Sequence, residues 1–185
     1  MLMERGNTVL LMVDIQEKLI DSIWNRESLL ENVETLIHLA EVFEMPVLIT
    51  EQYPKGLGRT IPRVADLLKE AYKPIEKLTF SCVGCEEFNE KTDSFCSKGY
   101  HHMIVCGIET HICVYQTVRD LSEDGVCNVH VAADAVGSRR EENWRWGLDL
   151  MREEGAFIKP TETIVFEMMG RSGTPEFKAM LPYIK

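Results

Sequence analysis

Short apolar runs alternate along the chain with longer stretches in which apolar residues recur every three or four positions. The run TVLLMVD (8–14) is continuous and too short for a helix, which is typical of a strand buried on both faces. Comparable runs lie at 46–50, 75–80, 102–107, 127–134 and 155–160. The pattern therefore predicts six strands.

The amphipathic stretches between these runs predict helices. In SLLENVETLIHLAEVF (28–43) the apolar residues fall on one stripe, and a capping-box pattern begins at Ser28. A second capping box begins at Ser138, and Thr174 precedes a proline at the start of the last helix. Further helices are expected at 62–71, 84–97, 110–124, 138–154, 161–169 and 175–183.

Strands that alternate with helices predict a three-layer α/β/α fold around a six-stranded, mostly parallel sheet. The 185 residues suit one domain, and no linker or repeat interrupts them, so residues 1–185 are expected to form a single domain. In such open sheets, ligands bind beyond the carboxyl ends of the strands. We therefore look for functional residues at the ends of the predicted strands.

Composition excludes several classes of function. The formal net charge of −10 disfavours general binding to nucleic-acid phosphates or anionic membranes. No apolar run approaches the ~18 residues that cross a bilayer. The start, MLMERGNTVLLMVD, has no small-residue cleavage site and indicates a strand, not a signal peptide. Six cysteines without an export signal favour reduced thiols in a cytoplasmic protein.

Three reactive residue types lie at the ends of predicted strands. Asp14 ends the first strand, Lys77 lies in the third, and Cys113 follows the fourth by a short turn. With Thr110 as N-cap, Cys113 would be the third residue of a helix, where free N–H groups and a nearby lysine lower the pKa of a thiol. Asp14 would take the thiol proton and return it to a leaving amine. From spacing alone, a helix-capping aspartate and an ion-paired lysine remain an open alternative.

The surrounding segments extend this pattern over nearly the whole chain. LLMVDIQEKL, TEQYPKGLG, KLTFSC, CGIETHICVYQTVRDL and VHVAADAVGSR occur in an order and at spacings that resemble the isochorismatase-like cysteine hydrolase superfamily. That superfamily includes isochorismatases, nicotinamidases and N-carbamoylsarcosine amidases. The resemblance runs from about residue 7 to 180, and YPKGLG is most similar to the branch without an assigned substrate. It implies the isochorismatase-like hydrolase fold.

The resemblance also implies roles for particular residues. Asp14 would be the general base, Lys77 the charge that stabilises the thiolate and the transition state, and Cys113 the nucleophile. A cis peptide bond would join Ile108 to Glu109. It would direct the backbone N–H groups of Glu109 and Cys113 to one point, forming an oxyanion hole.

Four residues beside the matched positions are candidate substrate contacts. Gln16, Tyr53 and Phe80 lie on segments that would surround the pocket, and Ile108 precedes the proposed oxyanion hole. Ordinary packing roles for Tyr53 and Phe80 remain equally open. The segment PKGLG (54–58) is expected to form a flexible lid.

Metal and cofactor chemistry is not expected. Nicotinamidases of the superfamily hold a metal with an Asp-x-His pattern after the second strand and a later histidine. Here that stretch reads Glu51-Gln52-Tyr53, and the next histidine afterwards is His101. The absence of the pattern argues against a catalytic metal.

The other cysteines permit a zinc or redox site, but their spacing is irregular. Packed reduced thiols are the favoured interpretation for Cys82, Cys85 and Cys96 beside His101 and His102, and core positions are expected for Cys106 and Cys127.

The remaining histidines and tryptophans suggest structural roles. His111 would point roughly 200° away from Cys113 on a helix, which disfavours a Cys–His pair. His38, on an exposed helix face, and His130, in a strand, have no supporting partner in the sequence. The two tryptophans of WRW (144–146) cannot share a helix face, so one is expected at an oligomer contact.

Together these features predict a metal-independent cysteine hydrolase that acts on a small amide, ureido or related substrate through a covalent acyl-enzyme. The resemblance further implies a homo-oligomer. Vinyl-ether hydrolysis of the isochorismatase kind and a non-catalytic binding protein that keeps the fold remain alternatives.

Overall fold

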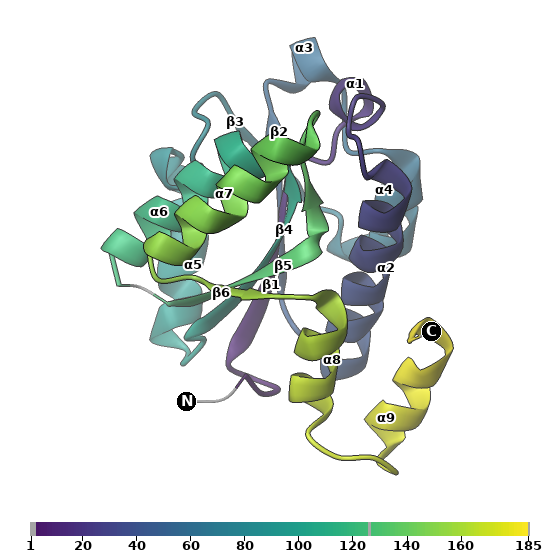
Figure 1. Cartoon of the computed structure of the whole chain (residues 1–185). Helices are drawn as coiled ribbons and strands as arrows, with labels where there is room; N and C mark the ends of the chain where they lie inside the picture. Colours follow the sequence, from purple (N-terminus) through teal and green to yellow (C-terminus); the bar gives the residue numbers. More distant parts are fainter. Residues whose placement is uncertain (1–2, 126, 185) are drawn as a thin grey trace.

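The computed structural model describes residues 3–125 and 127–184, and within them one parallel six-stranded sheet runs through the centre (Figure 1). The strand order is β3-β2-β1-β4-β5-β6. The bounds are β1 Thr8–Val13, β2 Val47–Gln52, β3 Ile75–Lys77, β4 His102–Ile108, β5 Asn128–Gly137 and β6 Phe157–Lys159. The predicted α/β class, strand number and parallel pairing are confirmed.

Helices cover both faces of the sheet (Figure 1). One core holds residues of α2, α4, α8 and α9, and the other holds residues of α5, α6 and α7. The bounds are α1 Glu17–Ile20, α2 Arg26–Phe43, α3 Pro54–Leu57, α4 Pro62–Leu68, α5 Glu86–Ser97, α6 Tyr115–Glu123, α7 Glu141–Glu153, α8 Thr161–Met169 and α9 Pro175–Met180. None of the helices described is long and apolar enough to cross a membrane.

The central strand β1 shows why its sequence is continuously apolar. Leu10 and Met12 pack into the core under α2, whereas Leu11 and Val13 pack into the core under α6. All six residues of β1 are buried. Side chains alternate between the two faces of a strand, so a strand covered on both sides needs apolar residues at successive positions.

Two predicted helix starts are wrong. Helix α2 begins before Ser28, because Asn25 anchors its start to β5 by donating from Nδ2 to the Val136 carbonyl. Helix α7 begins after Ser138, which is buried and accepts the Trp24 N–H at its carbonyl. In both places tertiary contacts replace the local capping box. The cap at Thr174 is confirmed, since its Oγ1 accepts the Phe177 N–H at 3.0 Å.

Two segments near the strand ends differ from their predicted form. Strand β3 stops at Lys77, three residues early, because the chain turns so that carbonyls of the next residues face the Lys77 ammonium. The predicted lid contains the short helix α3, and the Lys18 Nζ holds its Gly56 carbonyl at 2.8 Å. Both deviations place backbone close to the carboxyl edge of the sheet.

Candidate active site

Asp14, Lys77 and Cys113 meet at the carboxyl edge of the sheet. Asp14 directly follows β1 with a left-handed φ of 50°, Lys77 ends β3, and Cys113 lies in the turn after β4. Their exposed fractions are 0%, 3% and 7%. The three residues thus lie together beyond the carboxyl ends of the parallel strands, where the sequence analysis expected them.

Gly107, the sixth residue of β4, allows this approach. Its φ is +122°, and a Cβ there would lie 2.1 Å from the Val13 carbonyl oxygen. Only glycine lets the end of β4 pass so close to the end of β1. The turn that carries Cys113 is thereby held beside Asp14.

A buried ion pair forms the centre of the site. The Lys77 Nζ lies 2.7 Å from Asp14 Oδ2. Its three N–H donors are shared between Asp14 and three further acceptors, namely Gln52 Oε1 at 2.9 Å and the carbonyls of Thr79 and Phe80 at 3.2 and 3.1 Å. Burial lowers the pKa of Lys77, but the Asp14 carboxylate opposes burial, and the pKa is raised above its ordinary value. Lys77 is therefore a fixed positive charge.

The Asp14 carboxylate accepts hydrogen bonds from two side chains. Thr50 Oγ1 donates to Oδ1 at 2.7 Å, and Lys77 donates to Oδ2 at 2.7 Å. Carboxylates held by several donors keep one orientation. The Cys113 thiol lies near this fixed carboxylate, whose charge acts together with burial on the pKa of the thiol.

The acidity of Cys113 is opposite to the sequence prediction. Burial raises the pKa of its thiol to about 12, the Asp14 anion adds to this increase, and Lys77 opposes it. The predicted helix position is also wrong: residues 110–114 form a π-helical turn, and the α-helix starts only at Tyr115. Thr110 is not the N-cap, and its buried Oγ1 has no hydrogen-bond partner among the residues described.

Glu109 anchors the turn before Cys113. The peptide bond from Ile108 to Glu109 is cis. The Glu109 carbonyl accepts the N–H groups of Ile112 and Val114 at 3.0 and 3.3 Å. Its carboxylate accepts the backbone N–H of Arg139 at 2.9 Å and the Arg139 Nε at 3.0 Å. The turn is therefore tied both to itself and to the end of β5.

The candidate substrate contact Gln16 is buried and fully bonded. Its Oε1 accepts the Gln52 N–H at 2.8 Å, and its Nε2 donates to the carbonyls of Gln52 and Gly58 at 3.0 and 2.6 Å. An amide has two N–H donors, so both are used. The structure places Gln16 as a link between the end of β2 and the following loop.

The other candidate substrate contacts differ in their exposure. Tyr53 and Phe80 are 50% and 55% exposed, whereas Ile108 is fully buried in the core under α2. A cavity of about 350 Å³ reaches this edge and is lined by Tyr53, Pro54, Lys55, Glu76, Lys77 and Leu78. Substrate contact by Tyr53, Phe80 and Ile108 stays a prediction.

Three supporting residues were missed by sequence reasoning. Thr50 holds Asp14, Gln52 holds Lys77, and Cys82 lies against Thr50 with 3.8 Å between its Sγ and the hydroxyl oxygen. Alternation along β2 could have identified Thr50 and Gln52 as residues of one face. Burial raises the pKa of Cys82 to about 11, so this second thiol is protonated at neutral pH.

At the positions where nicotinamidases carry their metal motif, the side chains of this chain are already hydrogen-bonded to other residues of the protein. The buried Glu51 carboxylate accepts from Thr60, from the Tyr72 hydroxyl at 2.7 Å and from Arg59 at 2.9 Å. Gln52 binds Lys77, as described above. In residues 3–125 and 127–184, no three or more His, Cys, Asp or Glu side chains are arranged to hold a metal ion.

Two histidines expected to lack partners have them. The His38 ring stacks on Tyr183 with 3.7 Å between ring centroids. The His130 Nε2 lies 2.9 Å from the His102 Nδ1, and both rings are buried. These partners lie far away in the sequence, which is why local patterns did not indicate them.

His111 and the tryptophans follow the sequence prediction more closely. The His111 Nδ1 lies 3.0 Å from the hydroxyl oxygen of Ser138, the residue that directly follows β5. Trp144 is half-buried and donates to the Ala133 carbonyl, whereas Trp146 is 67% exposed. The two rings do face different environments.

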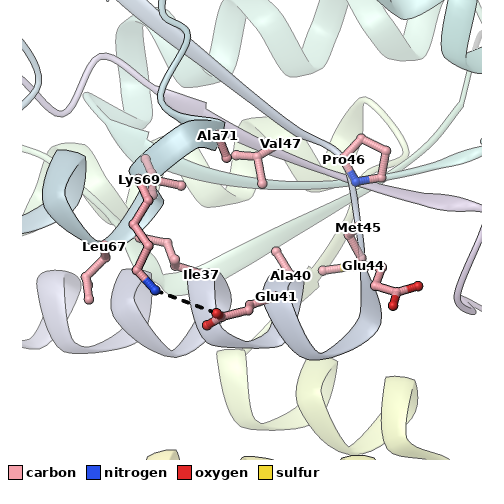
Figure 2. A pocket seen from close by; sticks show the side chains of 11 residues that line it. Ile37, Ala40, Glu41, Glu44, Met45, Pro46, Val47, Leu67, Lys69 and Ala71 are labelled. Atoms are coloured by element: carbon pink, nitrogen blue, oxygen red, sulfur yellow. Dashed lines mark ion pairs between the residues drawn. The ribbon is translucent and has the colours of Figure 1, made fainter.

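A second groove lies at the amino-terminal end of β2, between the end of α2 and α4 (Figure 2). It encloses about 390 Å³, and the Lys69 Nζ lies 3.8 Å from Glu41 Oε1 across it (Figure 2). Pro46 and Val47, at the start of β2, line it. Because Lys77 pairs with the other end of β2, this groove is separate from the cluster around Asp14.

The three-layer architecture and the buried polar cluster at its carboxyl edge define an α/β protein with the isochorismatase-like hydrolase fold. The isochorismatase domain matches residues 8–163, and the chain belongs to this family, whose members are hydrolases.

Known relatives extend this family match over the whole chain. Isochorismatase domain-containing protein 2 of Pongo abelii is 33% identical over 180 residues, covering 97% of this chain and 84% of that protein. The structure of the MAR1 ribonuclease from Caenorhabditis elegans has a TM-score of 0.88 at 33% identity, covering 100% of this chain and 92% of the other. The YcaC gene product of Escherichia coli, an octameric hydrolase of unknown specificity, has a TM-score of 0.86 at 22% identity, covering 98% and 92%.

Proposed function

We propose that the protein is a metal-independent cysteine hydrolase that cleaves a small amide, ureido or related substrate through a covalent acyl-enzyme. The observation that supports this most directly is the buried Cys113 thiol near the ion pair of Asp14 and Lys77, both of whose charges act on the pKa of that thiol besides burial. A nucleophile, a base and a fixed charge at one place in the fold are the parts that acyl transfer requires.

In the proposed first half-reaction, the substrate carbonyl enters beside Cys113. The thiol proton moves to Asp14 as sulfur bonds to the carbonyl carbon. The backbone N–H groups of Glu109 and Cys113 stabilise the tetrahedral oxyanion. Asp14 then gives the proton to the departing nitrogen, the C–N bond breaks, and an amine or ammonia leaves. A thioester on Cys113 remains.

In the second half-reaction, water attacks the thioester carbonyl. Asp14 accepts a proton from that water and returns it to the departing sulfur, which releases a carboxylic acid and restores the thiol. Lys77 keeps its proton throughout and stabilises the anion that passes between Asp14 and Cys113. Because the resting thiol has a pKa of about 12, the thiolate forms only as the carbonyl carbon is attacked.

The test is turnover of a panel of small amides and ureides, measured as ammonia release, with and without a chelator. Wild-type protein and the Cys85→Ala control should release ammonia equally from at least one substrate, and Cys113→Ala should release none. Cys85 is half-buried and lies 3.9 Å from the Glu76 carbonyl, so it is a matched thiol outside the cluster. Equal activity of the Cys113→Ala protein would refute the proposal.

RNA cleavage, which the name of the Caenorhabditis elegans structure suggests for that protein, is not favoured for this chain. Its net charge of −10 would repel a polyphosphate. A labelled RNA in the same panel tests this directly. Vinyl-ether hydrolysis would have Asp14 protonate the substrate without a covalent intermediate. That reaction would continue in the Cys113→Ala protein, whereas acyl transfer would stop.

We also propose a homo-oligomer in a reducing, cytoplasmic environment. The octameric assembly of the fold relative from Escherichia coli supports the first part, as do the exposed Trp146 and Leu150 of α7, which are 67% and 39% exposed. Among residues 3–125 and 127–184 no two cysteines form a disulfide, which supports a reducing, cytoplasmic environment.

A further inference from the structure

We propose that the ion pair between Glu109 and Arg139 positions the Glu109 backbone N–H for the oxyanion. This inference rests on the proposed function. The Glu109 side chain is 8% exposed and the Arg139 side chain 60%, so a buried carboxylate meets a guanidinium that reaches it from solvent. Arg139 would be a positioning residue, because it acts through Glu109 and not on the substrate.

The sheet register brings the two residues together. Ile108 of β4 is paired with Gly137 of β5, so the chain leaves both strands at the same level, and Glu109 and Arg139 follow within two residues. Two donors of Arg139, the backbone N–H and Nε, then converge on one carboxylate at 2.9 and 3.0 Å. A charged, two-pronged contact of this kind fixes direction as well as distance.

Glu109 is consequently held at both of its acceptor groups. Arg139 holds the carboxylate, and the N–H groups of Ile112 and Val114 hold the carbonyl. With side chain and carbonyl fixed, the remaining polar group, the N–H, has a defined direction. Without the guanidinium, the carboxylate keeps only a backbone donor in a nearly buried position, and it gains stability by turning toward water.

The effect should appear only in reactions that create an oxyanion. Acylation of Cys113 by p-nitrophenyl acetate forms a tetrahedral oxyanion before p-nitrophenolate leaves and the thioester remains. Alkylation by iodoacetamide displaces iodide from a saturated carbon and forms no oxyanion. Loss of an oxyanion-hole donor slows acyl transfer by about 10²–10³, so a displaced donor should slow it by about tenfold or more.

We therefore expect Arg139→Ala to acylate Cys113 about tenfold or more slowly than wild type, with alkylation of Cys113 unchanged within about twofold. Glu109→Gln, which keeps the side-chain shape but loses the charge, should likewise slow acylation of Cys113 and leave its alkylation unchanged. Millimolar guanidinium should restore part of the acylation rate of Arg139→Ala. Arg152→Ala is the matched control, since Arg152 is 58% exposed and pairs with Asp149 at 2.6 Å on α7.

The rates are measured by peptide mass mapping at Cys113, and melting curves confirm that each variant is folded. Wild-type acylation rates in both folded variants would overturn the positioning role. So would an equal decrease of acylation and alkylation, because that pattern indicates a change at the thiol. If neither probe modifies Cys113 in the wild-type protein, the proposed function itself fails together with this inference.

Discussion

Replacing Asp14 with asparagine should have opposite effects on turnover and on the reactivity of Cys113. Burial raises the pKa of the Cys113 thiol most, the Asp14 anion raises it further, and Lys77 lowers it. Asparagine removes the negative charge and keeps the shape. The Lys77 ammonium would retain Gln52 Oε1 and two backbone carbonyls as acceptors, so it would remain in place.

The size of the effect follows from the charges. The resting pKa of Cys113 is about 12, so only a small fraction of the thiol is ionised near neutral pH. Each unit by which the pKa falls is worth about 1.4 kcal/mol and increases the thiolate about tenfold. Unit charges about 4 Å apart interact by ~4 kcal/mol at an effective dielectric of ~20. We therefore expect Asp14→Asn to increase alkylation by at least about tenfold.

The assay is the rate of iodoacetamide labelling of Cys113, followed by peptide mass mapping from about pH 6 to about pH 10. The wild-type rate should rise about tenfold per pH unit over this range, and the variant should reach its plateau at lower pH. Turnover of the variant should be abolished, because no base remains. Asp21→Asn, at an exposed aspartate paired with Arg26, is the control. Labelling of Asp14→Asn that is no faster than wild type would refute the assignment of Asp14 as proton acceptor.

Three further outcomes are expected. Lys77→Met should abolish turnover and lower the free energy of unfolding in urea by about 3–5 kcal/mol, since it leaves the buried Asp14 carboxylate unpaired; an unchanged urea midpoint would contradict this. Burial lowers the pKa of His130 from 6.5 to about 3, so as the pH falls the unfolded chain binds a proton at this residue before the folded chain does. The free energy of unfolding should therefore decrease by about 2 kcal/mol by about pH 5. His130→Leu should remove this decrease and the exposed His101→Gln should not, as urea titrations at each pH would show. Light scattering should give a multiple of the 21.2 kDa chain mass, and a monomer would refute the oligomer.

The strand pattern and the location of the cluster could be predicted from sequence because both depend on local regularities. A continuous apolar run such as 8–14 is stable only between two helical layers, and parallel strands deliver their carboxyl ends to one edge. Asp14, Lys77 and Cys113 were therefore placed together without knowledge of any contact. Helix starts were less predictable, because Asn25 and Ser138 are engaged by residues on other elements.

The electrostatic state of the site could not be predicted in the same way. A lowered pKa for Cys113 was expected from a helix terminus and a lysine, but burial and the Asp14 charge dominate. Both depend on tertiary packing, as does the π-helical turn that separates Cys113 from the start of α6. The support of Asp14 by Thr50 depends on strand register, in which Val13 pairs with Thr50.

The central claim, that Cys113 becomes covalently acylated during turnover, is tested most directly by trapping the intermediate. Wild-type protein mixed with p-nitrophenyl acetate, quenched in acid and measured by intact-protein and peptide mass spectrometry should carry one acetyl group per chain on the Cys113 peptide. Neutral hydroxylamine should remove that group, as expected for a thioester. An acetyl group on Cys82 or Cys85 with none on Cys113, or turnover of an amide by Cys113→Ala at the wild-type rate, would contradict the account.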